Sequence, residues 1–373
     1  MTLSAVPETE MPMPLPGAVD QGTTRVAYGI THKRLDVAAN VTAIKGLPCD
    51  LAGCGVAVGL GNGGLAVFGG DGLTGPDLTA HGAAVTGLAG LENTLYSIAQ
   101  DNKLYAHDLN SGANSLLFSS SGQWLSSLTT APKTGYIAFV SGKTAFVLPT
   151  SASEAGARDF QFTEHPSSLS GLAFSPDGRR LAVSHYDGIT LWPLDGSGKG
   201  EMLRWKGYHI GVSWSPDGRF VVSATQEREL HVWDLVSGKD YRLGGYPAKI
   251  HELEWTGPDN GPAKLVCSGA DVITAWPFGD VGPDRLPPVE IGYVYSGRVT
   301  SVASHPNRRL VAGGYTTGTV LIGGLQKGEA AYARIADNQE ISALDWVKGG
   351  RVLAAGTRSA TLDLITVGEL KVQ

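Results

Sequence analysis

One pattern recurs along the whole chain and limits the folds that it can adopt. Its two most visible copies are GLAFSPDGRRLAVSHYDGITLW (171–192) and GVSWSPDGRFVVSATQERELHVW (211–233). Each has an apolar triplet, a Ser-Pro-Asp-Gly turn, a second apolar run, a polar turn and an apolar run that ends at Trp. Similar units fill the chain, and their first apolar runs begin at residues 41, 85, 125, 169, 209, 250, 299 and 341, in steps of 40 to 49 residues. An internal repeat of this length is typical of solenoids and propellers.

The apolar runs within each unit predict β-strands. Short runs that are rich in β-branched and aromatic residues and bounded by Gly, Asp or Pro are typical of strands. Each unit has three such runs and a weaker fourth, and long amphipathic helix patterns are not evident. Four strands in roughly 40–45 residues is the period of a propeller blade. The pattern therefore predicts an all-β protein, a β-propeller of four-stranded blades, with eight blades as the main expectation and seven as the alternative.

The two ends of the chain have different predicted roles. A propeller closes when a strand from the N-terminus pairs with the last repeat, because this pairing removes an open sheet edge and ties the termini together. The run TRVAYGI (24–30) precedes the first unit and is predicted to be that closing strand. Residues 1–22 contain four prolines and no periodicity, and we expect a disordered or loosely attached lead-in. Residues 23–373 are predicted to form a single propeller domain.

The units resemble the WD-repeat family of β-propellers. The resemblance rests on the Ser-Pro-Asp-Gly turns, on His81 and His165, each four residues before a first strand, and on the pair Trp233-Asp234. Degenerate versions of that pair are Trp192-Pro193, Trp276-Pro277 and His107-Asp108. The resemblance covers about residues 24–367. It implies a face of loops around the central channel that commonly binds peptides or partner proteins.

The fourth unit carries what looks like the complete hydrogen-bond set of that family: His165, Ser184, Asp187 and Trp192. The resemblance implies that these residues join the turns of one blade to its third strand. They would satisfy buried polar groups, each of which costs about 1–3 kcal/mol when left unpaired. A His, a Ser and an Asp in one unit also suggest a hydrolase, but only the structural role explains the Trp. We therefore expect a structural network and no catalytic residues.

Composition gives no sign of a nucleic-acid or membrane partner. The formal net charge is −6, and no apolar run approaches the length of a membrane span. The N-terminus lacks the basic and apolar regions of a secretory signal, so cytoplasmic residence is the expectation. Three cysteines are too few for a disulfide framework. Cys49 and Cys54 are weak candidates for a metal or redox role, and neither a metal nor another cofactor is expected.

The loops around the channel are the expected functional surface. They offer large amphipathic side chains of the types that dominate binding hot spots: Trp205, Arg228, Tyr246, Tyr315 and Arg358. The expected function is that of a non-catalytic WD-repeat scaffold, monomeric, which binds a protein or peptide on this face. The alternative is a propeller enzyme or a metal-handling accessory protein that uses the channel or the Cys49/Cys54 loop.

Overall fold

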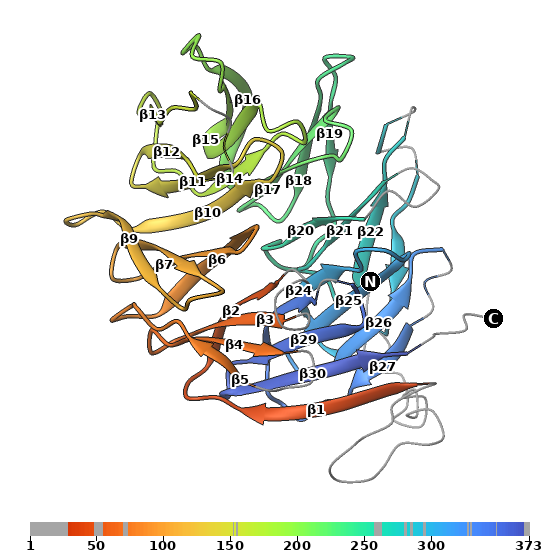
Figure 1. Ribbon diagram of the computed structural model, residues 1–373. Coiled ribbons are helices and arrows are strands. Elements are labelled where there is room, and N and C mark those ends of the chain that lie inside the picture. Colours follow the sequence, from red (N-terminus) through yellow and green to blue (C-terminus); the bar gives the residue numbers. More distant parts are fainter. Residues whose placement is uncertain are drawn as a thin grey trace.

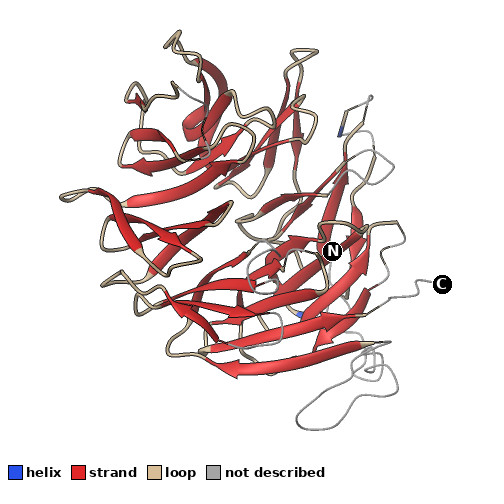
Figure 2. Ribbon diagram, viewed as in Figure 1, coloured by secondary structure: helices blue, strands red, loops and turns tan. Residues whose placement is uncertain are grey.

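The computed structural model describes most of the chain. It covers residues 29–47, 55–69, 74–151, 153, 156–256, 263–279, 282–283, 286–293, 296–326, 328, 330–347 and 349–368. The predicted lead-in (1–22), Cys49 and Cys54 lie outside these residues. Strands and their connecting loops make up nearly all of the ribbon in Figure 2. No helix in the described part of the chain is long and apolar enough to cross a membrane.

Thirty strands follow one another along the described part of the chain. The first half comprises β1 (Ile30–Asp36), β2 (Val41–Gly46), β3 (Gly55–Leu60), β4 (Leu65–Gly69), β5 (Thr74–Asp77), β6 (Val85–Leu91), β7 (Thr94–Ala99), β8 (Lys103–Asp108), β9 (Asn114–Ser119), β10 (Leu125–Ala131), β11 (Tyr136–Ser141), β12 (Thr144–Pro149), β13 (Phe160–Phe162), β14 (Gly171–Phe174) and β15 (Arg180–Pro193). The second half comprises β16 (Glu201–Trp214), β17 (Phe220–Thr225), β18 (Leu230–Asp234), β19 (Asp240–Leu243), β20 (Leu253–Trp255), β21 (Lys264–Cys267), β22 (Ile273–Pro277), β23 (Val289–Ile291), β24 (Val299–Ser304), β25 (Leu310–Tyr315), β26 (Val320–Gly324), β27 (Ala330–Arg334), β28 (Ile341–Trp346), β29 (Val352–Thr357) and β30 (Thr361–Val367).

Antiparallel pairing groups these strands into sheets that are arranged in a ring (Figure 1). Six sheets have four strands, in the orders β2-β3-β4-β5, β6-β7-β8-β9, β10-β11-β12-β13, β20-β21-β22-β23, β24-β25-β26-β27 and β1-β30-β29-β28. The seventh sheet has six strands, in the order β14-β15-β16-β17-β18-β19. The first strand of each unit lies innermost, and the chain then steps outward strand by strand. The predictions of an all-β fold and of a β-propeller are confirmed.

The six-stranded sheet contains two sequence units, because β15 and β16 each span two of the short runs seen in the sequence. The Nε2 atom of His185 lies 2.8 Å from Oγ1 of Thr190, although a straight strand would separate these residues by about 17 Å. The chain therefore turns back within β15, at Asp187 and Gly188, which have φ values of 65° and 143°. β16 pairs first with β15 as an outer strand and then with β17 as an inner strand.

The number of blades depends on whether sheets or inner strands are counted. Seven hydrogen-bonded sheets form the ring, which is the number given above as the alternative. The inner strands make contact in the closed order β2, β6, β10, β14, β16, β20, β24, β28 and back to β2, one for each of the eight units. Eight repeats are therefore accommodated in seven sheets, because the fourth and fifth repeats share one.

The N-terminal strand closes the ring, as predicted, but it lies further along the chain. β1 pairs with β30 from Ile30 opposite Val367 to Asp36 opposite Thr361 (Figure 1). The prediction of residues 24–30 is therefore wrong by about one strand length, and residues 24–28 lie outside the described part of the chain. The cause is exposure: the outer strand of a blade needs few apolar residues, so the polar run ITHKRLD gave no signal.

The core lies between neighbouring sheets. In β3, β17, β25 and β29 every residue is buried, as expected when both faces of a strand are covered. Three tryptophans at the ends of inner strands donate their indole N–H to the preceding repeat: Trp214 to the Ala173 carbonyl, Trp255 to the Ser213 hydroxyl and Trp346 to the Ala303 carbonyl, at 3.0–3.1 Å. Such bonds fix the rotation of one repeat against the next and satisfy these three indole donors.

Candidate functional site

The loops at one end of the strands form a continuous surface around the axis of the ring. In most repeats the turn after the second strand donates a backbone hydrogen bond to the residue just before the first strand. Examples are Gly61 to Asn40, Gln100 to Ala84, Gln226 to Tyr208, Thr316 to Arg298 and Arg358 to Glu340, at 2.9–3.0 Å. These bonds hold the loop that follows the second strand beside the loop that precedes the first strand. We call the surface that they form the loop face.

Exposed aromatic side chains gather on the loop face over the third, fourth and fifth repeats. Trp124, just before β10, is 65% exposed, Tyr186 in the β15 turn is 47% exposed, and Trp205 in β16 is 36% exposed. The Trp205 ring stacks on His231, with ring centroids 3.9 Å apart, so one of its faces is fixed while the other meets solvent. We call these three residues the aromatic arc. Trp124 was not among the predicted contact residues, although its position directly before a first strand was a usable signal.

Two of the other predicted contact residues are also on the loop face. Arg228 has a φ of 66° and donates Nη1 to the Pro247 carbonyl at 2.9 Å, which ties the fifth repeat to the sixth. Arg358 donates Nε to Glu340 at 2.8 Å, and its side chain is 66% exposed. With Trp205, these residues have atoms that a partner could reach.

The predictions for Tyr246 and Tyr315 are wrong, because both side chains are buried. Tyr246 is 8% exposed, and its hydroxyl accepts a hydrogen bond from Trp276 Nε1 at 2.7 Å and contacts Thr274 Oγ1 at 2.8 Å. Tyr315 has no exposed surface and packs in the core between the sixth and seventh repeats. Burial raises the pKa of both hydroxyls. Tyr246 occupies the place that a histidine takes in other repeats, so its polar tip points inward.

The four residues predicted as one network in the fourth repeat are divided between separate contacts. Trp192 Nε1 donates to His165 Nε2 at 2.9 Å, which agrees with the prediction for that pair. Ser184 Oγ instead lies 3.1 Å from Ser170 Oγ, and Asp187 accepts a hydrogen bond from the Gly207 amide at 3.4 Å. The reason is the register of the strands. Strand pairing places Ser184 one residue away from the position whose serine contacts a histidine in other repeats. A shift of one residue turns a side chain to the opposite side of the strand.

A complete network lies in the second repeat. His81 Nδ1 is 3.0 Å from Asp101, His81 Nε2 is 2.7 Å from Ser97 Oγ, and Ser97 Oγ is 2.6 Å from His107 Nε2. His107 takes the place of the Trp in the fourth and fifth repeats. Although Asp, His and Ser in a row resemble a catalytic triad, Ser97 has no exposed surface and its hydroxyl is already bonded to two imidazoles. The arrangement stabilises the blade and leaves no route for a substrate to reach the Ser97 hydroxyl.

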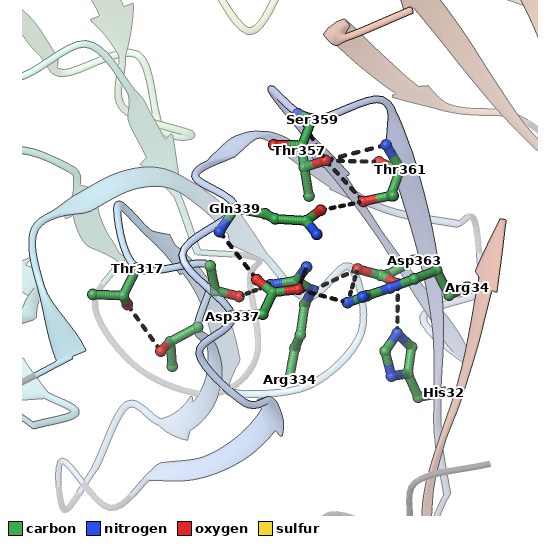
Figure 3. Close-up of polar contacts among 12 residues, drawn as sticks. His32, Arg34, Thr317, Arg334, Asp337, Gln339, Thr357, Ser359, Thr361 and Asp363 are labelled. Atoms are coloured by element: carbon green, nitrogen blue, oxygen red, sulfur yellow. Dashed lines mark hydrogen bonds and ion pairs between the residues drawn. The ribbon is translucent and has the colours of Figure 1, made fainter. Parts of the chain in front are cut away.

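In the eighth repeat an ionic cluster fills the space that the His81 network occupies in the second repeat (Figure 3). Asp337, four residues before β28, stands where His81 and His165 stand in their repeats, and Arg334 donates to it at 2.7–2.8 Å. Arg334 also donates Nε to Asp363 at 2.5 Å, and Asp363 accepts from His32 and Arg34 of the closing strand at 2.6 and 2.9 Å. Burial alone raises the pKa of Asp363, but hydrogen bonds from His32 and Arg34 outweigh it and hold the pKa at about 2.

Charged side chains occur around the axis only over part of the ring. The positions compared are the third and fifth residues of each first apolar run, counted from its start (41, 85, 125, 169, 209, 250, 299 or 341). Twelve of these sixteen side chains are Ala, Gly, Ser or Thr. The four exceptions are Lys45, Glu252, Glu254 and Asp345. Desolvation within the ring raises the pKa of Glu252 to about 8 and, with Asp345, that of Glu254 to about 7, although Glu254 is an exposed residue. Lys45 Nζ pairs with Asp345 at 3.2 Å. Among the described residues, no three His, Cys, Asp or Glu side chains are placed to hold a metal ion.

A hollow of about 530 Å³ opens on the loop face over the sixth, seventh and eighth repeats. We call it the axial hollow. It lies where the inner strand of the sixth repeat, β20, is only three residues long and the preceding residues leave the ladder. Its lining comprises Ala248, Lys249, His251, Glu252, Gly269, Arg298, Val299, Thr300, Glu340, Ile341, Ser342 and Arg358.

Comparison with known proteins agrees with the repeat geometry. The family model described as "WD domain, G-beta repeat" matches residues 157–190 and 204–234, which belong to the fourth and fifth repeats. Two repeats of the chain thus match the WD-repeat model, and together with the repeat geometry they support a WD-repeat β-propeller. The computationally designed protein Ika8, known from a crystal structure, is similar to this WD-repeat propeller in fold, with a TM-score of 0.68 and 19% identity over 89% of this chain and 98% of that one.

Curated relatives of this WD-repeat chain match it over limited segments. The chromatin assembly factor 1 subunit FAS2 homolog of Oryza sativa is 32% identical over 25% of this chain and 20% of its own length. The echinoderm microtubule-associated protein-like 4 of Xenopus laevis is 27% identical over 33% of this chain and 13% of its own length. The meiotic recombination protein rec14 of Schizosaccharomyces pombe is 29% identical over 25% of this chain and 32% of its own length. The chain therefore spans less than a third of the length of each.

Proposed function

We propose that this WD-repeat propeller is a non-catalytic cytoplasmic scaffold that binds a partner protein or peptide on the loop face. WD-repeat relatives are in general protein-interaction scaffolds, and their sheets serve as a rigid support for variable loops. Two relatives are named as a subunit of an assembly factor and as a microtubule-associated protein, and these names describe proteins that work within assemblies. The partner of this chain is to be sought among proteins rather than among small substrates.

The aromatic arc is the observation that carries this proposal. A folded protein in water seldom leaves two tryptophans and a tyrosine exposed on one face of three consecutive repeats, because each side chain would gain free energy on burial. Trp124, Tyr186 and Trp205 do so on the same loop face. Large aromatic side chains are enriched at binding hot spots, since they bury much area with little loss of conformational entropy. The arc is therefore the centre of the proposed interface, and Arg228 is at its edge.

A pull-down from native lysate tests the proposal. Wild-type protein serves as bait beside a variant that carries Trp124→Ala and Trp205→Ala. Val236→Ala is the matched control, because Val236 is 78% exposed but lies in the turn between the third and fourth strands, at the other end of the blade. We expect a specific partner with the wild type and the control, and its loss with the double variant, whose melting curve should still show a folded protein at the assay temperature. A partner retained equally by all three proteins contradicts the proposal.

One observation favours the alternative of chemistry near the axis. Glu252, Glu254 and Asp345 are coupled electrostatically, and the pKa values of the two glutamates lie near neutrality, where a general acid or base is most effective. Glu252, however, already accepts hydrogen bonds from the Val302 amide and the Ser301 hydroxyl, at 2.5 and 3.0 Å. This pairing gives it a structural role, in which it joins the sixth repeat to the seventh. An activity that disappears with Glu254→Gln, while partner binding persists, would establish the alternative.

A further inference from the structure

The charges around the axial hollow are unevenly exposed. Lys249, Arg298 and Arg358 come from three consecutive repeats, and all three are exposed, with side-chain exposures of 49% for Arg298 and 66% for Arg358. The two carboxylates of the lining are less accessible. Glu340 is paired with Arg358, and Glu252 is bonded to the next inner strand. Asp271, outside the lining, has a half-exposed side chain and lies 4.0 Å from Arg298. A ligand that approaches the lining from the loop face therefore meets more cationic than anionic groups.

We propose that the axial hollow receives acidic side chains of the partner segment that binds the loop face. The inference rests on the proposed function and adds the chemistry of the partner: an extended segment with Asp or Glu residues beside the apolar residues that contact the aromatic arc. Guanidinium and ammonium groups bind carboxylates through charge-assisted hydrogen bonds. Since Arg298 and Arg358 come from different repeats, they can contact an acidic side chain from two directions.

The net charge of the lining agrees with an anionic occupant. Burial raises the pKa of Glu252 to about 8, so this group is mostly neutral at pH 7. Among the lining residues, three cations then face one ionised carboxylate, that of Glu340, while Asp271 beside the hollow lies 4.0 Å from Arg298. The volume of about 530 Å³ is in the range of roughly 300–1,000 Å³ that ligand pockets occupy, and it accommodates one or two side chains rather than a folded domain.

The hollow and the aromatic arc belong to one surface. Arg228, in the turn of the repeat that carries Trp205, donates to the carbonyl of Pro247, two residues before Lys249. The Ala248 amide in turn donates to Gly269, which lines the hollow. An extended segment that leaves Trp205 toward Lys249 therefore passes from the fifth repeat to the neighbouring sixth repeat, whose loops are joined by the Arg228 hydrogen bond.

Fluorescence anisotropy with a defined probe tests this inference. The probe is a fluorescein-labelled peptide of eight alternating Glu and Gly residues. In a matched control peptide every Glu is replaced by Gln. The test variant carries Lys249→Glu and Arg298→Glu. Lys143→Glu is the control, since Lys143 is an exposed cation in a loop-face turn of the third repeat, away from the hollow. Melting curves of all proteins are measured in parallel.

The acidic probe should bind the wild type and the control alike, and the double variant should bind it about tenfold or more weakly. The Gln probe should bind none of them well, and added salt should weaken the acidic probe. Equal binding of both probes, or equal losses in the control and the test variant, would overturn the inference. The recovered partner separates a failure of this inference from a failure of the proposed function. If partner binding is lost with Trp124→Ala and Trp205→Ala but kept with Lys249→Glu and Arg298→Glu, the scaffold proposal stands. The proposal of an acidic segment is then wrong.

Discussion

Arg334 Nε lies 2.5 Å from Oδ2 of Asp363, and neither side chain is more than 1% exposed. Arg334 ends the outer strand of the seventh repeat, while Asp363 is on the third strand of the eighth. His32 and Arg34 reach the same carboxylate from the closing strand. A single buried carboxylate thus connects the N-terminal strand, the last repeat and its neighbour. The closure of the ring depends on this group as well as on the backbone ladder between β1 and β30.

Asp363→Asn should therefore destabilise the protein strongly. The substitution leaves the Arg334 guanidinium buried with part of its compensating charge removed, and breaking a buried ion pair costs about 3–5 kcal/mol. We expect a loss of this size in the free energy of unfolding by urea. The control is Glu340→Gln, which removes the half-exposed partner of the exposed Arg358 side chain and should change stability little. Equal stability of Asp363→Asn and wild type would mean that β1 is held by its backbone hydrogen bonds alone.

The buried histidine of the fourth repeat should make stability depend on pH. Burial lowers the pKa of His165 from an ordinary value of 6.5 to about 4. A protonated imidazole could no longer accept the Trp192 indole hydrogen. The stabilising contribution of neutral His165 is thus complete above pH 6.5 and is lost as the pH falls toward 4. Urea midpoints measured at pH 7 and 4.5 should differ less in a His165→Gln variant than in the wild type; an unchanged difference would refute this role.

Glu252 should have the opposite dependence on pH. Its pKa is raised from 4.5 to about 8, so the folded state favours the protonated form. Stability from this group is present below pH 4.5 and falls as the pH rises through 8. Glu252→Gln should flatten the decline in unfolding free energy between pH 6 and 9. The acidic probe should also bind the wild type more weakly above pH 8, where ionised Glu252 repels it. An identical pH profile in the variant would show that Glu252 ionises freely.

Replacing the hydroxyl of Tyr246 tests its assignment to the core. Tyr246→Phe keeps the ring but leaves the Trp276 indole N–H and the Thr274 hydroxyl without their shared partner. We expect a loss of about 1–3 kcal/mol in unfolding free energy and no change in partner binding. Trp205→Ala should instead weaken partner binding, and its loss of stability should be limited to the stacking contact with His231. Weaker partner binding by Tyr246→Phe at unchanged stability would restore Tyr246 to the interface.

The repeat could be predicted from the sequence more reliably than the residues of the candidate functional site. The spacing of first strands and the apolar second strands predicted the propeller, because residues that pack between sheets must be apolar. The closing strand was misplaced because Ile30–Asp36 is an outer strand that exposes polar side chains. Ser184 was misassigned because its side depends on a register that the letters alone do not specify. Arg334 and Asp363 were missed because isolated charges in a sequence look like surface residues, and their pairing joins segments 29 residues apart.

The most direct test of the central proposal is amide hydrogen exchange of the protein with and without its recovered partner. Binding on the loop face should slow exchange at residues 122–125, 186–188, 205–208 and 226–229, which surround the aromatic arc. The turns at the other end of the blades, such as residues 235–239 between β18 and β19, should exchange at unchanged rates. Protection confined to residues 235–239 and the equivalent turns, with no change around Trp124, Tyr186 and Trp205, would contradict the account.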